Sequence, residues 1–221
     1  MYQKMKGWEK VKFDCSLYLV TDSTGLGEKE FLYKIDEACK SGVTLVQLRE
    51  KDRSGREYLN LAFKVKEITD KYNIPLIIDD RLDIAMSIDA AGVHLGQSDI
   101  NIKYARKVMG KDKIIGATTK TIEQAKEAAK EGANYLGVGA IYPTTTKVKT
   151  VITDVKTLNE ICDNVNIPVV AIGGLNEGNC NILNGSKISG IAVVSAIMKA
   201  KDIKKAVEKL REIIQNNYSI N

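Results

Sequence analysis

Hydrophobic and polar residues follow two alternating patterns along this chain. Short aliphatic runs are separated by longer stretches in which apolar residues recur at helical spacing. The aliphatic runs predict eight strands, at residues 17–21, 44–48, 76–79, 92–95, 114–117, 135–138, 169–172 and 190–193. The helical spacing predicts helices at residues 28–40, 55–72, 81–88, 102–109, 122–131, 155–164, 177–183 and 196–215. Each predicted strand is therefore followed by a predicted helix.

This order of elements predicts an α/β fold, a single closed (β/α)8 TIM barrel of parallel strands. The length of 221 residues lies near the lower limit of roughly 200 residues for that fold. An open doubly wound sheet is the alternative, but its usual Gly-x-Gly-x-x-Gly turn does not fit residues 21–25 after the first strand. We expect one catalytic domain over residues 14–221. Residues 1–13 form a short N-terminal extension, either a cap or a frayed end.

Composition narrows the classes of partner. Hydrophobic residues make up 44% of the chain, which is enough for one continuous core. The net charge of +5 is spread over helices that also carry Asp and Glu, a pattern that favours anionic small molecules over nucleic acid. Four dispersed Cys and a single His argue against a disulfide scaffold and a zinc site. No apolar run has the length of a membrane span, so we expect a cytoplasmic protein without membrane partners, and a homo-oligomer is left open.

A threonine-rich segment at residues 142–149 follows the sixth predicted strand. Thr144, Thr145 and Thr146 carry hydroxyl donors, Lys147 adds a positive charge, and Pro143 ends the strand. These are groups that bind phosphate, although a solvated turn has the same composition. In a barrel of this type the functional groups lie on the loops at the carboxyl ends of the strands. The segment is therefore a candidate anion site.

The second predicted strand ends in a row of polar residues. Period-two alternation sends Gln47, Arg49 and Lys51 to one side and Leu48 and Glu50 to the other. Two cations and an amide therefore converge at the rim of the barrel. The alternative is that Arg49 only pairs with a neighbouring carboxylate.

Carboxylates follow the next two strands. Asp79 and Asp80 end the third strand, and Asp99 follows the fourth. Mg²⁺ takes one or two protein carboxylates and completes its shell with water and phosphate oxygens, and Asp80 and Asp99 suit that role. Each of these two residues could instead be only the N-cap of the helix that follows it.

The remaining strands contribute hydroxyls and glycines. Thr118 follows the fifth strand, Gly174 the seventh, and Val194 and Ser195 the eighth. A phosphate site after strands seven and eight recurs in this fold, so Gly174, Val194 and Ser195 are expected to bind phosphate through backbone N–H groups. The rim then holds two anion sites, which indicates two phosphorylated substrates. The lone His94 is interpreted as a core or supporting residue, not a proton-transfer group.

From Leu17 to Met198 the chain resembles the thiamine-phosphate synthase family. The resemblance rests on residues 18–22, 47–51, 80–81, 92–99, 137–147, 171–174 and 193–195. It implies a TIM barrel that couples 4-amino-2-methyl-5-(diphosphooxymethyl)pyrimidine with 4-methyl-5-(2-phosphooxyethyl)thiazole. The implied products are thiamine phosphate and pyrophosphate. It also implies Mg²⁺ as cofactor and a dissociative mechanism through a pyrimidine cation.

The resemblance further implies a role for each candidate residue. Arg49, Lys51 and Lys147 would be catalytic. The pyrimidine diphosphate would be bound by Gln47, Arg49, Lys51, Asp79, Thr118 and Lys147, the metal by Asp80 and Asp99, and the thiazole phosphate by Thr144, Thr146, Gly174, Val194 and Ser195. Asp79 departs from the family pattern, since many relatives have Asn there.

Two other functions remain open. The thiazole tautomerase and regulator-like branch of the same superfamily binds thiazole phosphate without coupling it. Its proton transfer uses a histidine after strand five, where this chain has Lys120. A phosphate-ligand sensor without catalysis is the second alternative, because a fold alone never establishes chemistry.

Overall fold

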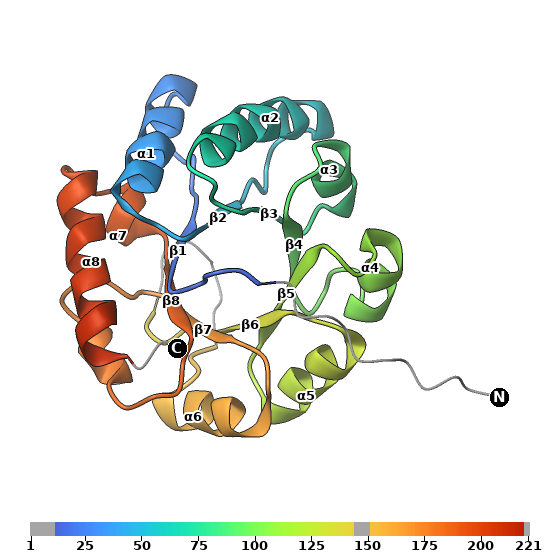
Figure 1. Cartoon of the computed structure of the whole chain (residues 1–221), viewed down its shortest axis with the longest axis vertical. Coiled ribbons are helices and arrows are strands. Elements are labelled where there is room, and N and C mark those ends of the chain that lie inside the picture. Colours follow the sequence, from blue (N-terminus) through green and yellow to red (C-terminus); the bar gives the residue numbers. More distant parts are fainter. Residues whose placement is uncertain (1–11, 144–150, 219–221) are drawn as a thin grey trace.

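The eight strands described by the computed structural model form a closed parallel barrel in which β8 pairs with β1 (Figure 1). The structure describes residues 12–143 and 151–218. The strands are β1 (Leu17–Val20), β2 (Leu45–Leu48), β3 (Leu76–Asp79), β4 (Gly92–Leu95), β5 (Ile114–Thr119), β6 (Tyr135–Gly139), β7 (Val169–Ile172) and β8 (Gly190–Val193). The predicted fold class is confirmed, with strands β5 and β6 running slightly longer than predicted.

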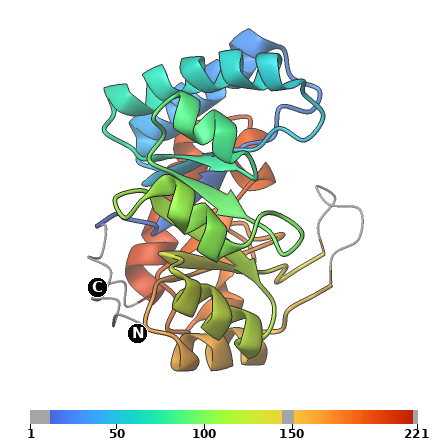
Figure 2. The same cartoon turned by 90° about the vertical axis from the view of Figure 1, so that its right-hand side faces the viewer.

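Helices surround the barrel on its outer side, as Figures 1 and 2 show. They are α1 (Glu28–Ser41), α2 (Gly55–Lys71), α3 (Leu82–Ser87), α4 (Ile102–Met109), α5 (Ile122–Glu131), α6 (Val155–Asn164), α7 (Ser195–Met198) and α8 (Ile203–Asn217). Several begin at side-chain caps that the sequence provides. Ser54 and Glu57 form a capping box at the start of α2, and Asp154 accepts from the Thr157 N–H at the start of α6.

Two predicted helices differ from the structure. The segment predicted as a helix over residues 177–183 contains only a 3₁₀ helix, η1 (Cys180–Leu183). The Asn176 side chain accepts from the Gly178 N–H at 2.8 Å, and the Asn179 side chain accepts from the Asn176 N–H at 2.9 Å. These short polar side chains satisfy the backbone locally and so compete with an α-helix.

The helix predicted over residues 196–215 is divided into α7 and α8. Asp202 lies between them and accepts from the Lys205 N–H at 3.0 Å, which starts α8 as a new helix. An N-cap residue has a non-helical backbone, so a continuous helix cannot pass through it.

Two hydrophobic layers hold the barrel together. Alternate strand residues such as Leu17 and Leu19 pack outward against the helices, whereas Tyr18 and Val20 belong to a second cluster inside the barrel. Phe13 packs against the inner cluster, with its ring edge-on to Tyr135 at 5.7 Å between centroids. Figure 1 shows the described residues before β1, 12–16, running across the ring of strands. In the described part of the chain, every helix is too short or too polar to cross a membrane.

Candidate active site

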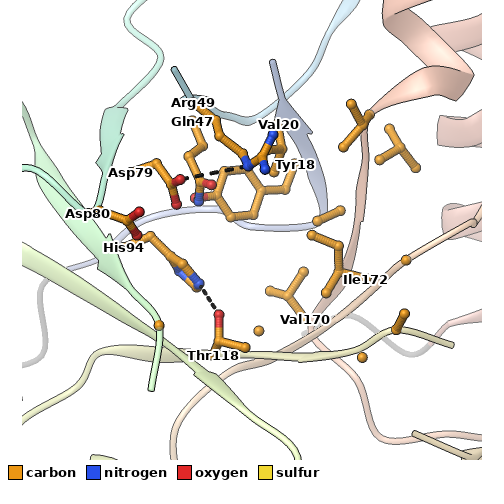
Figure 3. A pocket seen from close by; sticks show the side chains of 18 of the residues that line it. Tyr18, Val20, Gln47, Arg49, Asp79, Asp80, His94, Thr118, Val170 and Ile172 are labelled. Carbon is orange, nitrogen blue, oxygen red and sulfur yellow. Dashed lines mark hydrogen bonds and ion pairs between the residues drawn. The ribbon is translucent and has the colours of Figure 1, made fainter. Parts of the chain in front are cut away.

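A cavity of about 550 Å³ is lined by residues of all eight strands and of the loops at their carboxyl ends (Figure 3). It brings together every predicted site residue that the structure describes. These are Gln47, Arg49, Lys51, Asp79, Asp80, Asp99, Thr118, Gly174, Val194 and Ser195. Thr144, Thr146 and Lys147 lie outside the described residues. Residues scattered over most of the chain therefore meet in one place.

The polar row at the end of β2 has the predicted orientation. Gln47, Arg49 and Lys51 line the cavity. Glu50, between them in sequence, is bound elsewhere, since its carboxylate accepts from Ser23 Oγ and from Arg53 Nε, both at 2.8 Å. The alternation of an extended strand therefore continues past its last ladder residue.

Asp79 is the centre of an ionic cluster with the two cations of this row. Its Oδ2 atom lies 2.8 Å from Lys51 Nζ and 3.8 Å from Arg49 Nε. Burial raises the pKa of the Asp79 carboxyl, the charge of Asp80 raises it further, and Lys51 and Arg49 oppose that rise. Burial lowers the pKa of Lys51, but the bonds and charges of Asp79 and Asp80 outweigh it, so that pKa is raised. Arg49 thus has the carboxylate neighbour expected of a structural ion pair, and it also borders the cavity.

Asp80 and Asp99 form a second acidic pair on the same rim. Asp80 has a left-handed backbone with φ of 60°, and its carboxylate pairs with Lys51. Asp99 Oδ2 accepts from the Gly96 N–H at 2.7 Å. Burial raises the pKa of Asp99, and a hydrogen bond with Asp80 raises it further.

Neither residue of this pair is a helix cap. The N-cap of α3 is Arg81, and the N-cap of α4 is Asn101, whose side chain accepts from Lys103 N–H. The alternative that Asp80 or Asp99 serves only as a cap is therefore wrong. Both carboxylates line the cavity, and neither of them caps a helix.

The donor set suits Mg²⁺ better than a metal that needs a complete protein cage. Within residues 12–143 and 151–218 there is no group of three or more His, Cys, Asp or Glu side chains with metal-binding geometry. Asp80 and Asp99 provide two carboxylates that line the same cavity. Mg²⁺ commonly keeps several waters and binds through one or two carboxylates and substrate phosphates. The pair fits that mode of binding.

The opposite side of the cavity is formed by backbone and aliphatic side chains. Val170 and Ile172 face the polar residues of β2 to β5 across the cavity in Figure 3. Gly174, just beyond β7, has a φ of 67°, and a Cβ atom there would lie 2.7 Å from the Tyr142 Cβ atom. Only glycine fits this combination of backbone conformation and close approach. Val194 and Ser195, at the start of α7, complete this side.

A chain of hydrogen-bonded side chains that the sequence did not reveal lies beneath these groups. Gln47 Nε2 donates to the Tyr18 hydroxyl at 2.7 Å, which lies 2.7 Å from the Tyr135 hydroxyl. The Tyr135 hydroxyl lies 2.9 Å from His94 Nδ1, and His94 Nε2 lies 2.9 Å from Thr118 Oγ1. Burial raises the pKa of both tyrosines, so both hydroxyls keep their hydrogens. In the sequence, the sign of this hydrogen-bonded chain was a tyrosine in each of two predicted aliphatic strands, Tyr18 and Tyr135.

A family model, curated relatives and a solved structure at 37% identity point to the same family. The family model described as thiamine monophosphate synthase matches residues 17–197. The chain is 54% identical over 197 residues to the thiamine-phosphate synthase of Methanobrevibacter smithii, covering 89% of this chain and 94% of the relative. It is 51% identical over 203 residues to thiamine-phosphate synthase 2 of Streptococcus pneumoniae, covering 92% and 97%. A solved thiamine phosphate pyrophosphorylase from Pyrococcus furiosus superposes with a TM-score of 0.83 at 37% identity, covering 91% of this chain and 96% of that one.

Proposed function

Since the chain belongs to the thiamine monophosphate synthase family, we propose that it couples a pyrimidine diphosphate to a thiazole phosphate and releases pyrophosphate. The substrates would be 4-amino-2-methyl-5-(diphosphooxymethyl)pyrimidine and 4-methyl-5-(2-phosphooxyethyl)thiazole. The product would be thiamine phosphate. The observation that carries this proposal is that the described residues predicted for both anion sites line one cavity.

The diphosphate would bind beside β2. Arg49 and Lys51 supply cationic donors there, and Lys147, outside the described residues, would supply a third. Gln47, Asp79 and Thr118 would contact the pyrimidine. Asp79 departs from the pattern that the resemblance implies, and its ion pairs with Lys51 and Arg49 compensate its charge.

Charge balance favours a divalent cation with this substrate. The described residues lining the cavity include three cationic side chains, Arg49, Lys51 and Lys120, and three carboxylates, Asp79, Asp80 and Asp99. These charges cancel, so a bound diphosphate would leave a net negative cavity. Mg²⁺ held by Asp80 and Asp99 would neutralise negative charge on the diphosphate as the leaving group departs.

The thiazole phosphate would bind on the other side. Gly174, Val194 and Ser195 bring backbone to the cavity wall, and Thr144 and Thr146, outside the described residues, would add hydroxyl donors. The aliphatic Val170 and Ile172 would pack against the heterocycles. Each substrate phosphate would thus have its own set of donors.

The reaction needs no protein nucleophile. The bond between the pyrimidine methylene carbon and the diphosphate oxygen breaks, and its electron pair leaves with pyrophosphate. The ring amine donates electron density to the resulting methylene cation, and the thiazole nitrogen lone pair then forms the new C–N bond. No proton is lost, because the product is a thiazolium. The protein therefore has to orient two rings, exclude water and stabilise charge. Arg49, Lys51 and Lys147 would stabilise the charge.

Mass spectrometry of a single reaction mixture tests this function. Incubating the protein with both substrates and Mg²⁺ should give thiamine phosphate and equimolar pyrophosphate, and EDTA should stop both. Turnover of the thiazole phosphate alone would instead indicate the tautomerase branch. Binding of both compounds with no product would indicate a sensor. Product formation that is unaffected by EDTA would refute the metal requirement alone.

A further inference from the structure

The five-residue hydrogen-bonded chain described above joins two residues of the cavity wall through the interior of the barrel. Gln47 and Thr118, its ends, both line the cavity, whereas Tyr135 lies at its centre and is fully buried. Its five members come from β1, β2, β4, β5 and β6. The two ends are therefore coupled by geometry although they are 71 residues apart in sequence.

The Gln47 amide, which donates to Tyr18, sets the direction of the other three contacts. The Tyr18 hydroxyl accepts from Gln47, and among the described residues the acceptor within reach of its own hydrogen is the Tyr135 hydroxyl. The hydrogen of Tyr135 is then left for His94 Nδ1. A neutral imidazole that accepts at Nδ1 carries its proton at Nε2, where it donates to Thr118 Oγ1.

This direction determines what each end offers to a ligand. Gln47 donates one N–H of its amide to Tyr18 inside the barrel, and its carbonyl oxygen, which takes no part in that bond, is an acceptor for the cavity. Thr118 accepts from His94, which leaves its hydroxyl hydrogen as a donor for the cavity. The cavity is thus polarised, with the Gln47 acceptor on β2 and the Thr118 donor on β5.

We propose that Tyr135 is a positioning residue that fixes this polarity and thereby selects a ring with an amine at one edge and an acceptor at the other. The inference rests on the proposed function and extends it to the specificity for the aminopyrimidine. An oxo group in place of the amine would face the Gln47 carbonyl oxygen, acceptor against acceptor. Sites built around a hydrogen bond reject analogues that cannot form it far more strongly than hydrophobic pockets do.

The single histidine makes the direction directly measurable. With ¹⁵N-labelled histidine, the full-length protein has one imidazole in its NMR spectrum, that of His94. We expect the Nε2–H tautomer in the protein without substrate. The Nδ1–H tautomer, or an imidazolium at neutral pH, would overturn the proposal. This result does not depend on turnover, so it stands apart from any failure of the coupling reaction.

Tyr135→Phe tests the consequence for specificity, because it removes the hydroxyl and keeps the ring. We expect the KM for the pyrimidine diphosphate to rise about tenfold, the worth of roughly one buried hydrogen bond, and the preference for the 4-amino over the 4-oxo analogue to fall by about the same factor. The KM for the thiazole phosphate should stay within about twofold, a split that general loss of structure would not produce.

Tyr218→Phe is the matched control. Tyr218 is also buried, and its hydroxyl donates to the Cys180 carbonyl at 2.7 Å, away from the cavity. It should leave the amino-to-oxo preference unchanged. An unchanged preference in Tyr135→Phe as well would overturn the proposal. Should Tyr135→Phe not fold, the tautomer of the unaltered protein still decides the direction of the chain.

Discussion

Asp79 and Asp80 are adjacent in sequence, yet both border the same cavity, and Asp80 has a left-handed backbone with φ of 60°. Continued strand alternation would have sent the two side chains to opposite faces. A positive φ is uncommon outside glycine, although Asp and Asn adopt it more readily than other residues. The turn at Asp80 gathers negative charge at one point of the rim, where Lys51 pairs with both carboxylates.

Asp80→Asn and Asp99→Asn should each reduce coupling by roughly a hundredfold or more and raise the Mg²⁺ concentration needed for half-maximal rate. Asparagine tolerates the backbone of Asp80, so the loss would come from the missing charge. Initial rates over a Mg²⁺ titration measure both effects. Asp83→Asn, which removes an exposed carboxylate paired with Arg81 on the neighbouring α3, is the control and should leave them unchanged. A normal Mg²⁺ titration for both site variants would exclude the acidic pair as the metal site.

Arg49→Ala should lower kcat/KM by two orders of magnitude or more, about the loss that follows from removing a group that stabilises transition-state charge. The fold should remain, because Arg49 lies at the cavity and outside the hydrophobic core. Steady-state kinetics with a circular dichroism melt separate the two effects. Arg53→Ala, which breaks the pair with Glu50 outside the cavity lining, should keep near-normal turnover.

Lys147→Ala should have an effect similar in size to that of Arg49→Ala, since both are proposed to bind the diphosphate. Pyrophosphate release measured at saturating thiazole phosphate tests it. A Lys147→Ala enzyme with a near-normal rate would remove Lys147 from the catalytic groups.

Gly174→Ala should raise the KM for the thiazole phosphate at least about tenfold. Its Cβ atom would be both strained by the φ of 67° and too close to Tyr142. Gly185→Ala is the matched control, because Gly185 has a φ of 82° with open space around it. The Gly185→Ala variant isolates the cost of a side chain at positive φ, which we expect to lower the free energy of unfolding in urea by about 1 kcal/mol. Equal KM values for the two variants would show that Gly174 does not border the phosphate.

The four cysteines should react slowly with a thiol reagent at pH 8. Burial raises the pKa of Cys15 and Cys39 to about 12 and that of Cys162 and Cys180 to about 11, so very little reactive thiolate is present. Cys162, the most exposed of the four, should react first. A spectrophotometric thiol assay before and after adding guanidinium measures the difference. A rapid reaction of all four thiols in the folded protein would contradict the burial described here.

The barrel could be predicted from the sequence because the strand signal was repeated eight times, each time followed by a predicted helix. The row Gln47, Arg49 and Lys51 was also predictable, since alternation along an extended strand is a strict geometric rule. The missed features depend on exceptions to such rules. The α-helix expected over residues 177–183 is replaced by Asn-centred turns and a 3₁₀ helix. Asp79 and Asp80 were both predicted at the site, but the left-handed backbone of Asp80 was not, because sequence pattern does not encode it.

The hydrogen-bonded chain was missed for a different reason. Tyr18 and Tyr135 sit within aliphatic runs of strands that are distant in sequence, and only barrel closure brings their hydroxyls within 2.7 Å of each other. A period-two pattern shows that a residue points inward, but it cannot show which inward residue lies opposite. Only the three-dimensional structure could therefore show which side chains meet across the barrel.

Pairing of β1 with β8 has a consequence for the growing polypeptide. One edge of the first strand has no neighbour until residues 190–193 have been synthesised, and an open strand edge invites wrong pairing with other chains. The groups proposed to hold the two substrates also come from both sides of this seam. A nascent chain that stops before Gly190 would therefore lack Val194 and Ser195, two of the residues proposed to bind the thiazole phosphate. Binding of the thiazole phosphate would then report that β8 has closed the barrel.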